Sequence, residues 1–338
     1  MYLIKINTLS VAIVGLGVGE QHARAFQADS RSTVRVLCDL DPQKLADKAK
    51  TLGVPHTTAD FQAISYYTPI HIMSLASFDE DHAAQVLASL QAGQHVFVEK
   101  PLCRTQNELE SIHAQWQSQP RALLSNCVLR KAPLYEWLKE IIVEGELGDI
   151  YAFDGEYLYG RLHKIVEGWR KDVPDYSVMA GGGVHLVDLM LRLLGERPNT
   201  VTCVGNKIIT QNTPFQYDDF ATALYTFPSG LVGRISAHFG CVHRHHHVVR
   251  VFGSKGTFIY DDQGPRVHKS RAENSTAVVI DKNPLPAHKG VLVAPFLDSI
   301  QHNTFQTAAQ QEFDLVSVLV ATDKARQAKE TLSITYVE

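Results

Sequence analysis

Long apolar runs, clusters of basic residues and closely spaced cysteines are all missing from this chain of 338 residues. No stretch approaches the roughly 20 consecutive apolar residues that a membrane-spanning helix needs. Charged residues make up 20 % of the chain, and 36 acidic against 32 basic side chains give a net charge of −4. A weakly acidic chain without a basic block is a poor candidate for nucleic-acid binding. We therefore expect neither a membrane nor a nucleic acid as a partner.

The five cysteines argue against disulfides and against a cysteine-rich zinc site, because their number is odd and no two form a C-x-x-C pair. Reduced thiols in the cytoplasm are the simplest interpretation. Residues 1–10 also show no signal-peptide cleavage pattern, so we expect a cytoplasmic protein. The apolar content of 45 % is ordinary for a globular protein. The length predicts about two domains.

The first 126 residues alternate short apolar runs with helical patterns, as strand-helix units do. The apolar runs cover residues 11–14, 34–38, 70–75, 95–98 and 122–128. Between them, Asp41 and Pro42 are typical of a helix start and Gly53 of a helix end. This pattern predicts an α/β domain over residues 1–126, with a parallel sheet and helices on both faces.

Residues 127–338 follow a different pattern, with helices expected over 132–144, 184–194 and 310–330. Residues 150–159 alternate as a half-exposed strand does, and residues 201–260 contain strand patterns broken by turns. We therefore expect a second, α+β domain built on an open, mostly antiparallel sheet.

A glycine-rich turn follows the first apolar run, in the sequence V-A-I-V-G-L-G-V-G. Gly15 suits the tight turn, and Gly17 lets the backbone approach a pyrophosphate at the start of the next helix. Gly19 comes one residue earlier than in G-x-G-x-x-G. Asp39, at the end of the second run, suits the ribose 2′-hydroxyl of NAD and repels the 2′-phosphate of NADP. A plain strand-helix turn and, for Asp39, a turn residue before a helix are the alternatives.

Lys100 follows the fourth apolar run, in H-V-F-V-E-K-P-L. Pro101 biases Lys100 towards an extended conformation, so Lys100 is expected at the carboxyl edge of the sheet, where ligands bind in this architecture. A lysine there can polarise or deprotonate a substrate hydroxyl, with Glu99 holding it in place. Taken alone, an E-K-P sequence also suits a surface turn.

Several motifs occur in a fixed order along the chain. They are Gly15-Leu16-Gly17 with His22, Asp39, the segment 95–102, G-E-L-G-D-I at 145–150, Trp169-Arg170, Gly181-Gly182-Gly183, V-H-L-V-D at 184–188 and F-G-S-K-G-T at 252–257. Together they resemble the Gfo/Idh/MocA oxidoreductases over nearly the whole chain. The resemblance implies a Rossmann domain followed by a substrate-binding and oligomerisation domain over residues 127–338. It also implies hydride transfer between NAD(P) and a hydroxyl of a sugar, cyclitol or sugar-nucleotide.

The same resemblance assigns site residues, with NAD as the expected cofactor and no metal. Lys100 corresponds to the catalytic lysine and His185 to its acid/base partner. The implied cofactor contacts are Gly15, Leu16, Gly17, Val18, Gly19, Gln21, His22, Asp39, Leu40, Ala76, Ser77, His82, Glu99, Lys100, Asn126 and Arg170. The implied substrate contacts are Lys100, Tyr159, Trp169, Arg170, His185 and Asp188. A homodimer or homotetramer formed through the second domain's sheet is also implied, and His82 is expected to be structural rather than chemical.

One position departs from the family pattern. Many members carry an aspartate four residues before the histidine, whereas this chain has Gly181. A complete Lys-Asp-His triad therefore cannot be transferred. Asp172 and Asp175, in the preceding loop, are candidates to supply the carboxylate.

His185, Asp188 and Arg192 form a polar stripe on an otherwise apolar helix, because their i, i+3, i+7 spacing places them on one face. Such a stripe must meet polar partners or a wet cleft. Asp188 and Arg192 can pair at i, i+4. His185 then lies near the helix N-terminus, where the dipole favours the neutral imidazole that a general base needs. A structural histidine bonded to a backbone carbonyl or to Asp188 is the alternative.

Two further groups of residues remain open in interpretation. Residues 157–161 and 169–171 are rich in aromatic and cationic groups, which suit sugars and anionic groups but also a domain-interface loop. His243, His245 and His247 would share a face of a strand, as zinc ligands do. No carboxylate or cysteine nearby completes a zinc set, so we favour a solvated or interface strand.

The sequence leaves three functions open. The first is an NAD-dependent dehydrogenase acting on a sugar-like hydroxyl, in which Lys100 and His185 handle the proton and Asp188 orients His185 or the substrate. The second is a dinucleotide-binding regulator without turnover, to which the glycine at position 181 is a partial hint. The third is an enzyme that retains NAD and eliminates or hydrolyses through transient oxidation.

Overall fold

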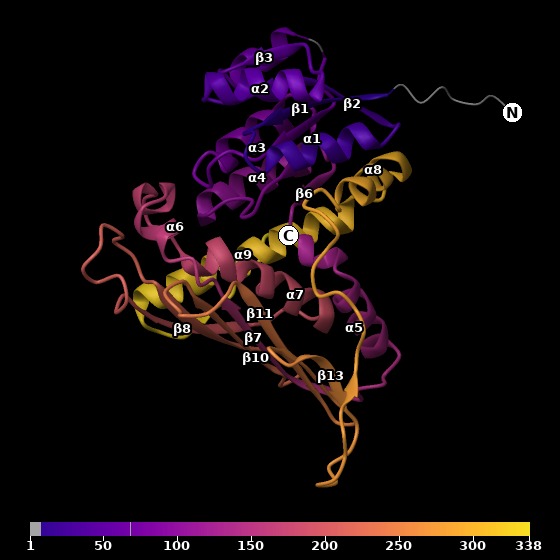
Figure 1. Cartoon of the computed structure of the whole chain (residues 1–338), viewed down its shortest axis with the longest axis vertical. Coiled ribbons are helices and arrows are strands. Elements are labelled where there is room, and N and C mark those ends of the chain that lie inside the picture. Colours follow the sequence, from indigo (N-terminus) through magenta and orange to yellow (C-terminus); the bar gives the residue numbers. More distant parts are fainter. Residues whose placement is uncertain (1–7, 68) are drawn as a thin grey trace, which may run out of the picture. The chain divides into compact units, whose positions relative to one another are not determined.

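The structure is a computed structural model that describes residues 8–67 and 69–338. Residues 1–7, on which the signal-peptide expectation partly depends, lie outside the described part. Contacts divide the chain into two compact units (Figure 1). Unit 1 comprises the described part of Met1–Val128 together with Ala287–Val316 and Val337–Glu338, and unit 2 comprises Leu129–Pro286 and Ser317–Tyr336. Unlike the single cut expected after residue 126, the chain returns to unit 1 near its C-terminal end.

Unit 1 is built on a parallel sheet of six strands in the order β3-β2-β1-β4-β5-β6. The strands are β1 Leu9–Val14, β2 Ser32–Cys38, β3 His56–Thr58, β4 Ile72–Leu75, β5 His95–Val98 and β6 Leu123–Ser125. The strand order reverses direction beside β1, and the carboxyl ends of β1 and β4 border the crevice in which such sheets bind ligands. The predicted parallel α/β sheet is confirmed.

The helices of unit 1 begin and end where the sequence supplies caps. They are α1 Gly19–Ala28, α2 Pro42–Leu52, η1 Gln62–Tyr66, α3 His82–Gln91, α4 Gln106–Ser118 and α8 Val293–His302. The Asp41 carboxylate caps α2 by accepting from two backbone N–H groups, and Gly53 ends the helix with a left-handed φ of 66°. Thr105 and Glu108 form a capping box at the start of α4.

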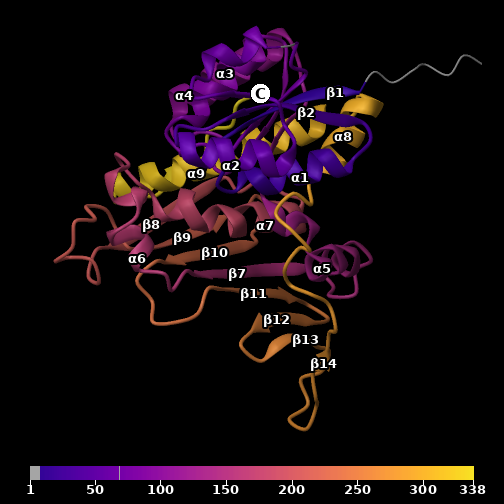
Figure 2. The same cartoon turned by 45° about the horizontal axis from the view of Figure 1, so that its top comes forward.

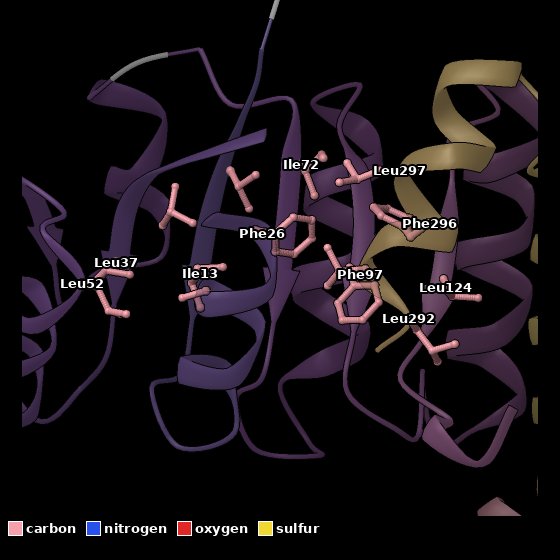
Figure 3. Packing of buried hydrophobic residues seen from close by; sticks show 14 of the residues in the cluster. Ile13, Phe26, Leu37, Leu52, Ile72, Phe97, Leu124, Leu292, Phe296 and Leu297 are labelled. Carbon is pink, nitrogen blue, oxygen red and sulfur yellow. The ribbon is translucent and has the colours of Figure 1, made fainter. Parts of the chain in front are cut away.

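The apolar core of unit 1 joins segments that are far apart in the sequence (Figure 3). Phe97 on β5 lies between Phe26 of α1 and Phe296 of α8, with ring centroids 5.8 Å and 5.5 Å away. All three rings are almost completely buried. Helix α8, which the sequence analysis did not predict, therefore completes the layer that covers this face of the sheet.

Unit 2 contains a nine-stranded sheet in the order β14-β13-β12-β11-β7-β10-β9-β8-β15 (Figure 2). The strands are β7 Ile150–Leu158, β8 Thr200–Asn206, β9 Phe220–Thr226, β10 Val232–His238, β11 His246–Gly253, β12 Thr257–Asp261, β13 Gly264–His268, β14 Val278–Val279 and β15 Leu332–Ser333. Neighbouring strands are antiparallel apart from β7 and β10. The predicted open, mostly antiparallel sheet is confirmed.

Helix α7 packs on one face of this sheet, where Leu186 and Met190 lie against the glycines at positions 155 and 233. The remaining helical segments that the structure describes are η2 Val128–Lys131, α5 Pro133–Val143, α6 His163–Val166, η3 Trp169–Asp172, the π-helical turn η4 Met179–Gly183, α7 Val184–Leu194 and α9 Gln306–Ala328, which is shared with unit 1. Across both described ranges, no helix combines the length and apolar character that crossing a membrane requires. All five cysteines are free thiols.

Candidate functional site

The glycine turn in unit 1 has the geometry that a dinucleotide phosphate needs. Gly15 adopts a left-handed φ of 80°, and any Cβ there would overlap the backbone of Ala76. Around Gly17 there is open space instead. Helix α1 then begins at Gly19 without a side-chain cap, so its first N–H groups are available to an anion.

Asp39 ties the tip of this turn to the end of β2. Its carboxylate accepts hydrogen bonds from the backbone N–H groups of Leu16 (2.7 Å) and Asp41 (2.9 Å) and pairs with the Lys44 ammonium at 3.1 Å. Burial raises the pKa of Asp39, but these hydrogen bonds and the Lys44 charge outweigh it and leave the pKa below its ordinary value. The turn thus has an ionised carboxylate beside it, and the side chain of Leu40 next to it is exposed.

A buried polar network lies behind the segment that carries Lys100. His22 contacts Ser74 Oγ at 3.0 Å and Glu99 Oε1 at 3.2 Å, and the Asn126 amide donates to Glu99 Oε1 at 2.7 Å. The same amide donates to the Lys289 carbonyl at 2.9 Å. Burial alone would raise the pKa of Glu99. The effects of His22, Lys100 and Asn126 outweigh burial and leave the pKa well below its usual range. Glu99 is therefore an anion that holds three segments of unit 1 together.

Lys100 lies two residues after the end of β5, at the carboxyl end of the sheet, and is half-buried. A cis peptide bond joins it to Pro101, whose carbonyl is within hydrogen-bond distance of His82 Nδ1 at 2.7 Å. His82 is fully buried and contacts the backbone of this turn, and its structural role stays a prediction.

The remaining residues assigned to the cofactor in unit 1 flank the same turn. Val18 and Gln21 are exposed, and Ala76 and Ser77 follow β4. The Ser77 hydroxyl donates to Gln85 of α3 at 2.7 Å. The resemblance did not include Ser74 or Lys289, because neither belongs to a motif and only the fold brings them to the network.

His185 lies in the first turn of α7 in unit 2, half-buried among aromatic rings. The ring centroids of Tyr157 and His247 are each 6.2 Å from that of His185. His247 pairs directly opposite Tyr157 in the β11–β7 ladder. The cross-strand register therefore places His247 beside the predicted acid/base residue, a neighbour that the sequence analysis did not identify.

Asp188 has a different partner from the one expected. Its carboxylate is bound by the Arg130 guanidinium, with Nε 2.9 Å from Oδ1 and 3.0 Å from Oδ2, and both side chains are buried. This pairing replaces the expected i, i+4 pair with Arg192. Because Arg130 belongs to η2, the ion pair fixes α7 against η2, and Asp188 meets a buried cation rather than solvent.

Steric crowding explains why a glycine occupies position 181. A Cβ there would overlap the Tyr176 hydroxyl, and a Cβ at Gly182 would press on the Tyr157 ring. The Tyr176 hydroxyl in turn accepts a hydrogen bond from Arg170 Nε at 3.0 Å. A buried tyrosine therefore fills the space beside position 181, while the two aspartates considered as substitutes, Asp172 and Asp175, are exposed.

The histidine tract does not place three histidines on one face, and that expectation is wrong. Strand β11 begins only at His246, so His243 lies outside it and pairs with Asp262 at 2.9 Å. His245 and His247 instead face Tyr157, each at a ring distance of 5.3 Å. Among the described residues, no group of three or more His, Cys, Asp or Glu side chains could hold a metal ion.

Comparison with known proteins finds a family match in two successive segments of the chain. Residues 9–126 match the oxidoreductase family with an NAD-binding Rossmann fold, and residues 135–259 match the GFO/IDH/MocA C-terminal domain. Levoglucosan dehydrogenase of Pseudarthrobacter phenanthrenivorans is 23 % identical over 76 % of this chain and 74 % of its own length. Myo-inositol 2-dehydrogenase of Thermotoga maritima is 23 % identical over 75 % of each chain.

A solved structure of levoglucosan dehydrogenase in complex with NADH has the same fold. It superimposes with a TM-score of 0.85 at 20 % identity and covers 98 % of this chain and 100 % of its own. The glycine turn, the carboxylate at the end of β2, the lysine after β5 and the sheet of unit 2 occur together with matches to both family domains. The chain therefore belongs to the Gfo/Idh/MocA oxidoreductases and carries their NAD-binding Rossmann domain.

Proposed function

We propose that this protein is an NAD(H)-dependent dehydrogenase. It moves a hydride between the nicotinamide and a hydroxyl or keto carbon of a sugar, cyclitol or sugar-nucleotide. The observation that carries the proposal is the position of Lys100, two residues after β5 in a domain of the NAD-binding family. The relatives named above, which act on levoglucosan and myo-inositol, support the substrate class.

In this proposal Lys100 and His185 are the catalytic residues. When bound, the dinucleotide supplies the ring that accepts or gives the hydride. Lys100 polarises the substrate hydroxyl, and His185 takes or returns its proton as general base or acid. The network of His22, Glu99 and Asn126 positions the segment that carries Lys100. Unit 1 then binds the dinucleotide, and unit 2 binds the substrate.

The preference for NAD over NADP is assigned to Asp39. Its ionised carboxylate accepts the backbone N–H of Leu16 in the glycine turn, which places a negative charge where a 2′-phosphate would have to approach. A ribose 2′-hydroxyl can instead donate a hydrogen bond to it. The open space around Gly17 and the uncapped start of α1 suit the pyrophosphate.

The test is titration of the purified chain with NADH and NADPH by nicotinamide fluorescence, followed by NAD with a panel of sugars, cyclitols and sugar-nucleotides. We expect NADH to bind at least about tenfold more tightly than NADPH. A repulsion on the order of 1.4 kcal/mol between the Asp39 carboxylate and the 2′-phosphate gives a factor of ten. A rise in absorbance with a panel member identifies a dehydrogenase and its substrate.

Lys100→Met is the decisive variant. It should abolish most of the turnover while leaving the affinity for NADH close to that of the unsubstituted chain, because the side chain acts on the substrate. Unchanged turnover would reject the role of Lys100. Tight NADH binding with no turnover on any substrate would instead favour the regulator or the enzyme that retains NAD.

We also propose that the protein works in the cytoplasm as a homodimer or homotetramer. The free thiols support a reducing compartment. The exposed apolar side chains Val204, Leu224 and Val232, on the sheet of unit 2, support assembly through that sheet.

A further inference from the structure

The two faces of β7 in unit 2 differ in charge. Asp154 and Glu156 point to one face and are bound there by the guanidinium groups of Arg234 and Arg250. Tyr157 belongs to the opposite face, where its ring neighbours are aromatic and imidazole groups. The negative charges of this strand are therefore already neutralised on the face away from His185.

Two arginines converge on a single tyrosine ring on the His185 side. The guanidinium carbon of Arg161 is 5.6 Å from the centroid of the Tyr159 ring, and that of Arg170 is 5.9 Å from it. Arg170 also stacks on Trp169 at 4.4 Å and donates to the Tyr176 hydroxyl. Tyr159 is buried and packs against Tyr157, so the ring is a rigid support for both cations.

No carboxylate partner of Arg161 exists within the part of the chain that the structure describes. Its polar contact is with His245 Nδ1 at 3.4 Å. Because a guanidinium only donates, this nitrogen of His245 is the acceptor. Arg161 is exposed and lies beside the ring cluster that holds His185.

Arg161 and Arg170 thus place two positive charges beside one ring, and an anionic group bound at that ring would be attracted to both. Arginine is the side chain best suited to the task, because its fork donates two parallel hydrogen bonds to a carboxylate or phosphate. A neutral sugar has no charged group that would use guanidiniums placed beside this ring. The charge on the His185 side of β7 is thus complementary to an acidic ligand.

We propose that the substrate is an acidic sugar or cyclitol, bearing a carboxylate or a phosphate that Arg161 and Arg170 bind. This inference rests on the dehydrogenase function proposed above and narrows it from sugars in general to anionic ones. It makes Arg161 a specificity-determining residue.

Matched neutral and anionic substrates test the proposal with the full-length protein and NAD. The set is glucose, glucuronate and glucose 6-phosphate, with myo-inositol and an inositol monophosphate as the cyclitol arm. We expect the kcat/KM of one anionic member to exceed that of its neutral counterpart by about tenfold or more, the effect of one charge-assisted hydrogen bond. Preference for the uronate or for the phosphate identifies the acidic group.

Arg161→Gln should lower kcat/KM for the anionic substrate by about tenfold or more, mainly through KM, and change the neutral substrate less than twofold. Arg161→Lys should recover part of the loss. Arg244→Gln is the matched control, because Arg244 is an exposed arginine of the same unit that already pairs with Asp262. Equal losses on anionic and neutral substrates, or a neutral substrate preferred by the unsubstituted chain, would overturn the proposal.

Calorimetric titration of the NADH complex with glucuronate and with glucose 6-phosphate separates this inference from the proposed function. Anion binding that Arg161→Gln removes, in a protein without turnover, would support the anion site and reject the dehydrogenase. Turnover of neutral sugars without anion binding would do the reverse.

Discussion

At the scale of single residues, Asp323 on α9 is a carboxyl group whose charge responds to mild changes of pH. Its side chain is only 20 % exposed and accepts a hydrogen bond from Ser177 Oγ at 2.6 Å. Burial raises the pKa of Asp323 to about 6, against the opposing effects of Ser177 and Arg326, with Asp218 adding to the rise. Ser177 immediately precedes the helical turn that leads to the glycine run, so this carboxyl helps to hold that turn.

The raised pKa has a defined consequence for stability. The folded state holds the Asp323 proton more tightly than the unfolded state does, so the contribution is complete below about pH 4 and is lost as the pH rises through about 6. Asp323→Asn stays neutral at every pH. We expect it to match the unsubstituted chain near pH 4 and to be more stable by about 3 kcal/mol at pH 8.

Urea unfolding of the full chain at pH 4 and at pH 8 measures this difference, with the exposed Asp281→Asn as the control variant. A gain for Asp323→Asn that is equal at both pH values would contradict the assignment, because only the ionised carboxylate is expected to cost stability.

The residues that belong to local motifs could be predicted from the sequence, and those held by distant partners could not. Gly15 needs a left-handed φ, and Asp39 directly follows a strand, and both properties can be read from neighbouring residues. The partner of Asp188 is 58 residues away in the chain. Periodicity within one helix could suggest Arg192, but it contains no information about Arg130.

At the scale of elements, α8 shows how a helix far along the chain completes a core built near its start. Its apolar residues at positions 293, 296, 297 and 300 follow helical spacing. Phe296 is 2 % exposed and packs edge-on against Phe97 (Figure 3). We expect Phe296→Ala to destabilise unit 1 by about 3–5 kcal/mol, the usual cost of emptying a phenylalanine site.

Thermal unfolding monitored with and without NADH measures the effect of Phe296→Ala. Tyr66→Ala, which truncates an 86 % exposed aromatic residue of the same unit, should leave the transition unchanged. Equal midpoints for Phe296→Ala and the unsubstituted chain would show that α8 is not part of the cooperative core.

The spacing that marks α8 was available in the sequence, and this helix could have been predicted. The position of β7 could not. The sequence predicts antiparallel hairpins between consecutive strands, yet β10 and β11 lie on either side of β7. That insertion makes β7 and β10 the parallel pair of the sheet. The parallel pairing joins β10 to a strand about 80 residues earlier in the sequence. Arg234 of β10, for example, pairs with Asp154 of β7 across that separation.

At the scale of the whole molecule, the sequence could indicate two domains, because the pattern changes near residue 126. It could not indicate the return of Ala287–Val316 to unit 1. This segment returns to unit 1 because the apolar face of α8 packs against core residues that lie within the first 126 residues.

The sheet of unit 2 leads to the last prediction, on assembly. Leu224 on β9 is 49 % exposed and pairs in register with Arg234 of β10, on the face that carries the Asp154 ion pairs. Leu224→Arg would place an additional cation beside Arg234 and remove apolar area, and like charges across strands are destabilising. In sedimentation at micromolar concentration, we expect the unsubstituted chain to be a dimer or tetramer and Leu224→Arg to be a monomer. Val143→Arg, at an exposed residue of α5, should keep the assembly, and a monomeric unsubstituted chain would refute assembly through this sheet.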